Sequence, residues 1–200
     1  MNDSKMSKSK VTSMMYNAMF VHNGHQPRAE EFHEQDFTPY ERDIISNMKF
    51  KHLPVFGSNI KDTTVYNPSK WTKPVNKIHV HTQPWVIRKN LTFTKGDRVN
   101  PSDLVDSERL IRRLDFVKDA RIMIRQGSSR KKADVVVVTQ DVFPYSFLLT
   151  PNNDNDALFG VSNVNIAGLG HELEYDYIRG GGSDFFYRVP NVYGTFIDSE

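Results

Sequence analysis

The stretch DSERLIRRLDFVKDARIMI, residues 106–124, changes its hydrophobic period halfway along its length. In and just before its first half, small or apolar residues recur every three or four positions, at Leu104, Ser107, Ile111 and Leu114. This spacing predicts one face of an α-helix. In its second half Ala120, Ile122 and Ile124 alternate with Arg121 and Met123, which predicts a strand. The short link between them predicts that the helix folds back and covers the strand.

The flanking segments extend this pattern into an α+β domain over residues 43–141. Asn100 and Pro101 are typical of a helix start, with Asn as the cap and Pro at the first helical position. The strand over 119–125 leads through a turn into ADVVVVTQ, whose four valines predict a central strand covered by helices on one face. Upstream, a strand from Ile44 and a short helix in VIRKNLTF complete the order strand, helix, helix, strand, strand. The predicted core comprises Ile111, Leu114, Ile122, Ile124, Val136 and Val138.

The remaining segments differ in character. Residues 1–42 are interpreted as an N-terminal helix at 11–19 followed by a linker, and residues 56–77 as a long excursion. Residues 142–200 hold two basic residues against eight acidic ones, whereas the rest of the chain is basic. Within that acidic part, alternating apolar and acidic positions over 169–177, a turn at RGGGSD and a second aromatic run predict antiparallel strands. The strands of a transmembrane barrel and those of a soluble sheet share this pattern.

Composition limits the classes of protein. The chain has 200 residues, 38% hydrophobic and 25% charged, and contains no run of about 18 apolar residues that would predict a membrane helix. It has no cysteine, so neither a disulfide framework nor a thiolate metal site is expected. The polar opening MNDSKMSKSK is not typical of a secretory signal.

The order of these elements resembles a known family. The run VIRKNLTFTKGDRVNPSDLVDSERLIRRLDFVKDARIMI, residues 86–124, resembles a POTRA domain of the BamA/TamA superfamily of outer-membrane assembly proteins, in its Bacteroidetes-type form. VVVVTQD followed by FGVSNVNIAGLGHELEYDY is similar to the junction between the last POTRA domain and the first barrel strand. The resemblance implies a βααββ domain followed by the first, antiparallel strands of an incomplete transmembrane β-barrel. It therefore implies a fragment of a longer protein, or a diverged short relative. At most four strands are expected after residue 141.

The resemblance also implies a function and two sites. POTRA domains receive unfolded outer-membrane protein clients, and the barrel assists their insertion. Outer-membrane lipid and accessory assembly proteins are therefore expected partners, with the POTRA-like domain facing the periplasm and no nucleic acid bound. Clients would add a strand to an exposed sheet edge. If the first strand pairs with the third, that edge is Ala120, Arg121, Ile122, Met123, Ile124 and Arg125, and its arginines would guard it against self-association. The barrel seam strand, over Val161–Tyr177, would carry Val161, Asn163, Asn165, Gly168 and Gly170.

The sequence gives little evidence of catalysis. HELEY at His171 has Tyr175 where a zinc protease motif needs its second histidine. His79 and His81 could share a strand face, but no carboxylate or third histidine is near them in the sequence. No nucleophile can be placed beside a base. We therefore predict a non-enzymatic protein with no catalytic residue, no cofactor and no metal.

A second function stays open at this point. The most basic stretch, Arg130 to Lys132 with four further arginines nearby, also fits a soluble module that binds nucleic acid or an anionic surface. Interleaved aromatic residues are absent from it, which argues against a platform for single-stranded nucleic acid.

Overall fold

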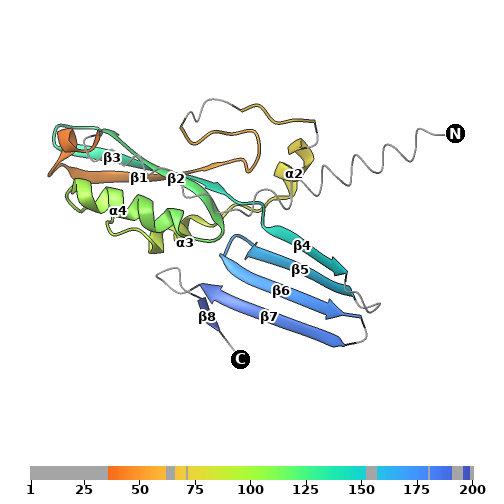
Figure 1. Ribbon diagram of the computed structural model, residues 1–200. Helices are drawn as coiled ribbons and strands as arrows, with labels where there is room; N and C mark the ends of the chain where they lie inside the picture. The colour runs from red at the N-terminus through yellow and green to blue at the C-terminus, as the bar shows by residue number, and fades with distance from the viewer. Residues whose placement is uncertain are drawn as a thin grey trace.

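The computed structural model describes residues 36–61, 66–70, 72–151, 157–179, 181–190 and 196–198. The helix predicted at residues 11–19 lies outside these ranges. In the part that is described, two sheets follow one another along the chain (Figure 1). No helix among the described residues is long and apolar enough to cross a membrane.

The first sheet has three strands and confirms the predicted βααββ order. After a short 3-10 turn, η2 (Thr38–Tyr40), β1 (Ile44–Leu53) pairs in parallel with β3 (Lys132–Asp141), and β2 (Val117–Gln126) pairs antiparallel with the other side of β3. Helices α3 (Pro84–Lys89) and α4 (Pro101–Arg112) lie along one face of this sheet (Figure 1). We call this unit the α/β layer. The four valines are therefore on the central strand, as predicted.

Helix α4 begins where the sequence predicts. The side chain of Asn100 accepts a hydrogen bond from the Ser102 N–H at 3.3 Å, and Pro101 is the first helical residue. Leu104 and Ile111 of the helix are fully buried against Val135 and Val137 of β3. The predicted period thus fixes which face of the helix enters the core.

Two of the six predicted core residues are only partly buried. Ile111, Leu114, Ile122 and Val138 are buried, whereas Ile124 and Val136 are half-buried. Val136 and Val138 lie on the opposite face of the sheet from the helices, in a smaller cluster with Leu53 and Ile60. The sheet is therefore covered on both faces, which a single-face interpretation missed.

The long excursion after β1 covers that second face. It contains helix α2 (Thr72–Ile78), which buries none of its own residues and was not predicted. The buried side chain of Gln140 on β3 donates hydrogen bonds to the carbonyls of Pro54, Val55 and Ser58 at 3.0–3.4 Å. One amide thus holds the start of the excursion against the end of the central strand.

The second sheet has five antiparallel strands in sequence order, one more than expected. They are β4 (Tyr145–Pro151), β5 (Ala157–Ile166), β6 (His171–Ile178), β7 (Gly182–Pro190) and β8 (Phe196–Asp198). Strand β4 was not predicted. The single strand predicted over Val161–Tyr177 is wrong, because β5 ends at Ile166 and a tight turn precedes β6.

Close packing explains that turn. Ala167, Gly168 and Gly170 all have positive φ, at 53°, 74° and 72°. A Cβ on Gly168 would lie 2.2 Å from the carbonyl oxygen of His81, and one on Gly170 would lie 2.5 Å from the ring of Phe116. These glycines therefore mark a turn pressed against the α/β layer, not a bend within a strand.

The buried face of β2 gives a stability prediction. Ile122 is 3% exposed beneath α4, so Ile122→Ala should lower the free energy of unfolding by about 2–5 kcal/mol. Ile124→Ala, on the same strand and face but half-buried, is the matched control and should cost less. Urea unfolding followed by circular dichroism measures both. Equal losses would contradict the burial of Ile122 in the core.

Candidate functional site

Strand β2 lies at one edge of the α/β layer, because β1 pairs with β3. The condition that the first strand pairs with the third is therefore fulfilled, and client binding at this edge stays a prediction. Gly127 N–H donates to the Lys132 carbonyl at 2.7 Å and closes the β2–β3 hairpin. Counting back from that bond, Arg125, Met123 and Arg121 direct their backbone groups toward β3, and Ala120, Ile122 and Ile124 direct theirs outward.

Side chains of α4 already bind the first half of this edge. The Glu108 carboxylate accepts from Ile122 N–H at 2.7 Å, and Arg112 Nε donates to the Ala120 carbonyl at 2.9 Å. Arg112 also contacts Glu108 at 2.6 Å and Asp119 at 3.1 Å. We call Glu108, Arg112 and Asp119 the α4 clasp. Because the clasp satisfies these backbone groups, the edge at Ala120 and at the Ile122 N–H is closed to another strand.

The open part of the edge is shorter than the six predicted residues. Among the described residues, none bonds the Ile122 carbonyl or the N–H and carbonyl of Ile124, which all point outward. Arg125 is exposed and lies 3.7 Å from Asp134 on β3. Arg121 reaches the Lys61 carbonyl on the excursion at 3.4 Å. Arg121 is therefore directed at the excursion and away from the edge that it was predicted to guard.

Burying the Glu108 carboxylate of the clasp disfavours its charged form. Burial raises the pKa of Glu108 above its ordinary value of 4.5, although the Ile122 N–H bond and the charge of Arg112 lower it. The folded state therefore binds a proton at Glu108 more tightly than the unfolded chain does. The resulting contribution to stability is complete below the ordinary pKa and is lost as pH rises through the folded-state pKa.

The raised pKa of Glu108 gives a prediction for how stability depends on pH. Glu108→Gln keeps an acceptor for the Ile122 N–H but cannot titrate. The unfolding free energy of the native chain minus that of the variant should therefore fall as pH rises from about 4.5 toward neutrality. Urea unfolding of both chains across this range measures the difference. A difference that grows with pH would mean that Arg112 and the Ile122 N–H outweigh burial.

The predicted seam residues do not form a strand edge. Val161, Asn163 and Asn165 lie on β5, which pairs with β4 on one side and β6 on the other. Gly168 and Gly170 lie in the turn that follows. The outer strand on this side of the second sheet is β4. It was not predicted, because Leu148 and Leu149 interrupt its alternation of apolar and polar residues.

Asn165 instead joins the two sheets. Its side chain is buried, donates to Thr82 Oγ1 at 2.9 Å and accepts from Gly170 N–H at 2.8 Å. Gln83 N–H donates to the Gly168 carbonyl at 2.8 Å. The segment of residues 79–83 therefore lies between the turn and the end of β3. We call this region the junction.

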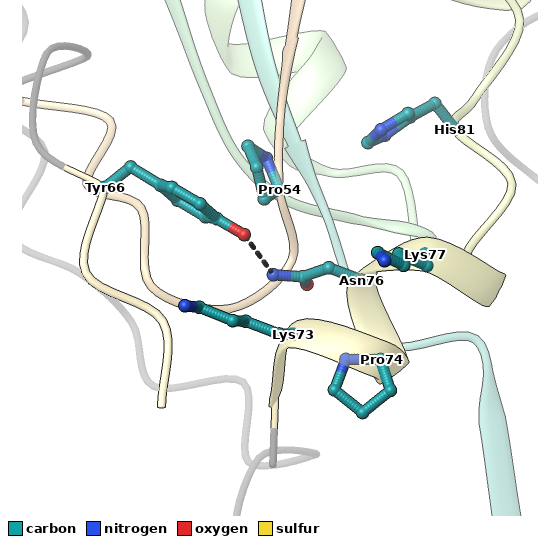
Figure 2. Close-up of a pocket in the computed structure, with 7 residues that line it drawn as sticks. All are labelled: Pro54, Tyr66, Lys73, Pro74, Asn76, Lys77 and His81. Atoms are coloured by element: carbon teal, nitrogen blue, oxygen red, sulfur yellow. Dashed lines mark hydrogen bonds between the residues drawn. The ribbon is translucent and has the colours of Figure 1, made fainter. Parts of the chain in front are cut away.

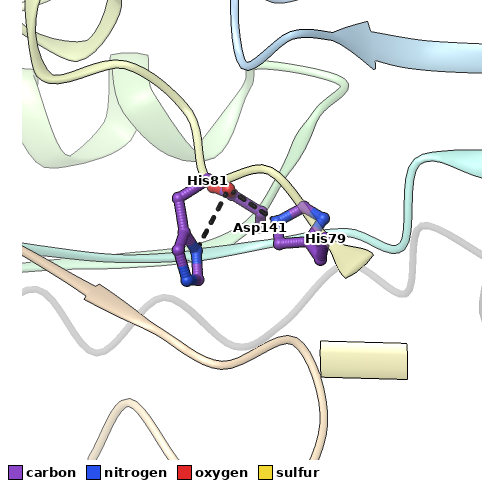
Figure 3. A group of neighbouring side chains, drawn as sticks. All are labelled: His79, His81 and Asp141. Atoms are coloured by element: carbon purple, nitrogen blue, oxygen red, sulfur yellow. Dashed lines mark hydrogen bonds and ion pairs between the residues drawn. The ribbon is translucent and has the colours of Figure 1, made fainter. Parts of the chain in front are cut away.

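Three polar side chains meet at the junction (Figure 3). His79 Nε2 lies 3.0 Å from Asp141 Oδ2, which also accepts from Thr82 N–H at 2.8 Å. His81 Nδ1 lies 3.9 Å from the same oxygen. The fold thus supplies the carboxylate that is not near these histidines in the sequence. They lie in a loop, not on a strand face, and Asp141 is 62 positions from His79 along the chain.

A third histidine adjoins this group. The ring of His52 on β1 stacks on that of His81 with 5.7 Å between centroids, and its Nδ1 lies 2.9 Å from Thr139 Oγ1. Burial lowers the pKa of both His52 and His81 below 6.5, although Asp141 opposes the shift. Both rings therefore favour the neutral form, which can accept a hydrogen bond or bind a cation.

An open groove of about 440 Å³ leads to His81 (Figure 2). It is lined by Pro54, Tyr66, Lys73, Pro74, Asn76, Lys77 and His81. Asn76 donates to Tyr66 Oη at 3.4 Å across it. The groove gives solvent a path to the exposed side of the histidine group.

The second sheet exposes a continuous apolar face. The strand register places Phe147, Val161, Tyr175 and Phe185 in one row across β4 to β7, and Leu149, Phe159 and Tyr177 in the next. Leu149 and Phe185 are 69% and 63% exposed. The other face carries Glu172 and Glu174, which lie 3.4 and 4.0 Å from Arg188. One face is thus mostly aromatic and apolar, and the other carries the charged residues together with exposed Leu148 and Phe186.

Known structures to which the chain is similar include two outer-membrane proteins, BamA and CdiB. The crystal structure of BamA from Haemophilus ducreyi lacking POTRA domains 1–3 matches with a TM-score of 0.49 at 13% identity, over 74% of this chain and 25% of that chain. CdiB from Acinetobacter baumannii matches with a TM-score of 0.38 at 12% identity, over 95% of this chain and 50% of that chain. No family model and no curated protein matches the sequence. Because the scores and identities are low, neither similarity assigns a function.

Proposed function

We propose that this chain is a non-enzymatic component of outer-membrane protein assembly. The exposed apolar face of the second sheet, joined directly to the α/β layer, carries this proposal. Rows such as Phe147, Val161, Tyr175 and Phe185 suit the lipid-facing side of barrel strands, while Glu172 and Glu174 suit a polar lumen. The second sheet would therefore lie in the membrane and the α/β layer in the periplasm.

We also propose the division of the chain that its pattern predicts. Residues 1–42 would precede the POTRA-like domain over 43–141, and the barrel strands would occupy 142–200. Support comes from the short link between the sheets: β3 ends at Asp141 and β4 begins at Tyr145.

Clients would pair with the open part of the β2 edge. The outward backbone groups of Ile124 and the Ile122 carbonyl offer a short template for an extended chain. The α4 clasp limits the addition to this part, because Ala120 and the Ile122 N–H are already bonded. The mode is non-covalent and needs no catalytic residue.

The alternative basic module gains little support from the structure. Arg112 is bound in the clasp, and Arg121 donates to the Lys61 carbonyl. Arg130, Lys131 and Lys132 at the hairpin tip are exposed. A hairpin tip of this size is a small surface for an extended anion.

The two faces of β7 provide a matched test of membrane insertion. Phe185 lies on the apolar face and Phe186, its neighbour, on the charged face, and both are exposed. An arginine on a lipid face costs about 2–4 kcal/mol near the bilayer centre. Phe185→Arg should therefore reduce co-flotation with phosphatidylcholine vesicles at least about tenfold, and Phe186→Arg should reduce it much less.

Comparing a neutral with an anionic lipid distinguishes membrane insertion from binding of a basic surface. If the native chain fails to float with phosphatidylcholine but floats with phosphatidylglycerol, the membrane-spanning proposal is wrong and a basic surface module is favoured. Equal losses for the two variants would show that the lipid-facing side has been wrongly assigned.

Client pairing can be tested by photocrosslinking. A photoreactive residue at Arg125, beside the open part of the edge, should crosslink to an unfolded outer-membrane protein. The same residue at Lys131, which is also exposed but lies at the hairpin tip, should crosslink much less. Equal yields at the two positions would argue against strand addition at β2.

A further inference from the structure

We propose that His79, His81 and Asp141 bind a divalent transition-metal ion of the zinc class, and that this ion fixes the junction between the two sheets. The ligand atoms of these side chains all lie within 4.8 Å of one another. A tetrahedral zinc site has bonds of about 2.0–2.2 Å, which places its ligand atoms roughly 3.4 Å apart. The distances of 3.0 and 3.9 Å from Asp141 Oδ2 to His79 Nε2 and His81 Nδ1 lie on either side of that spacing.

Unsatisfied polar atoms are the second observation that indicates a ligand. Within the described residues, buried atoms without a hydrogen-bond partner include His79 Nδ1, His81 Nδ1, Asp141 Oδ1 and His52 Nε2. The side chains of His79 and Asp141 are 0% and 1% exposed. Buried polar atoms nearly always have partners, so unpartnered atoms on adjoining side chains point to a ligand. His81 Nδ1 is one of the atoms named above for the ion, and His79 and Asp141 each carry a further unpartnered atom.

The donor set determines the class of ion. Two imidazoles and one carboxylate suit zinc, copper or nickel, whereas magnesium and calcium prefer oxygen donors. The bond from Thr82 N–H to Asp141 Oδ2 orients the carboxylate, as outer partners of metal ligands commonly do. The His52 ring, stacked on His81, brings a third imidazole beside the set.

The site is accessible from one side. His81 has a side chain that is 41% exposed, and it lines the open groove beside α2. Solvent therefore reaches the exposed part of the His81 ring, whereas His81 Nδ1, His79 and Asp141 lie on the buried side. This asymmetry also makes His81 the ligand that can be replaced with least damage to the fold.

The position of the ligands gives the ion a structural role. Asp141 ends β3 shortly before β4 begins, and His79 and His81 lie in the segment that contacts the turn after β5. Thr82 accepts from Asn165, and Gln83 N–H donates to Gly168, on the second sheet. An ion bound at these residues would stabilise the orientation of the second sheet against the α/β layer. The proposal does not depend on the assembly function.

Isothermal titration of the full chain, purified without an affinity tag, tests the site. Zinc chloride should bind in a one-to-one ratio, and magnesium chloride should not bind. His81→Ala should weaken zinc binding at least about tenfold. His171→Ala is the matched control, because His171 lies on β6 and bonds Tyr187, and it should leave binding unchanged.

A structural readout completes the test. Zinc should slow hydrogen exchange at residues 79–83 and 165–170 in the native chain but not in His81→Ala. Circular dichroism will verify that the variant is folded. The absence of zinc binding, or binding that His81→Ala leaves unchanged, would overturn the proposal. Binding lost in His171→Ala would place the ion elsewhere and would overturn it equally.

Discussion

The arrangement of both sheets depends on the buried carboxylate of Asp141. This residue ends the central strand, where its Oδ2 accepts from Thr82 N–H and lies 3.0 Å from His79 Nε2. It thereby holds residues 79–83, and these in turn bond the turn between β5 and β6 through Asn165 and Gly168. A buried charge is costly unless it is paired and hydrogen-bonded. The structure concentrates those partners at the point where the chain leaves one sheet for the other.

The α4 clasp bonds part of the backbone at the exposed edge strand of the α/β layer. Edge strands invite association with other chains, and proteins commonly cover or charge them. Here Glu108 and Arg112 bond the backbone of Ile122 and Ala120 directly, so the helix does more than cover a face. The same residues leave Ile124 open. The edge is therefore limited in length, a property that favours short, reversible strand addition over uncontrolled association.

The sequence predicts the α/β layer well, because the residues that recur at the helical or strand period are mostly the residues that are buried there. Leu104 and Ile111 lie on one helical face, and that face is the buried one. The prediction fails where a turn is set by contacts between residues far apart in the sequence, or where the hydrophobic period indicates the wrong element. The turn at Gly168 and Gly170 interrupts the segment 161–177, which the sequence pattern predicted as one strand. The close approach of His81 and Phe116 accounts for the two glycines.

The candidate site could not be found from the sequence for a related reason. His79 and His81 are two positions apart, but Asp141 and His52 reach them from other strands. Helix α2 was missed because it buries no residue and so has no period to detect. Local patterns thus predict elements, whereas sites assembled at the ends of elements need the topology as well.

The two sheets meet opposite physical demands. Side chains bond part of the β2 edge of the α/β layer, and both faces of that sheet are covered, so the layer suits water. The second sheet has an aromatic face that is costly to expose to water. Its outer strands β4 and β8 each have one neighbour among the described residues, and unpaired edges are costly in lipid. Additional strands that pair with β4 or β8 would bond the unpaired edges. Lipid against Phe147, Tyr175 and Phe185 would cover the aromatic face. Lipid on the apolar face and strand pairing at β4 and β8 would therefore stabilise this sheet by separate contributions.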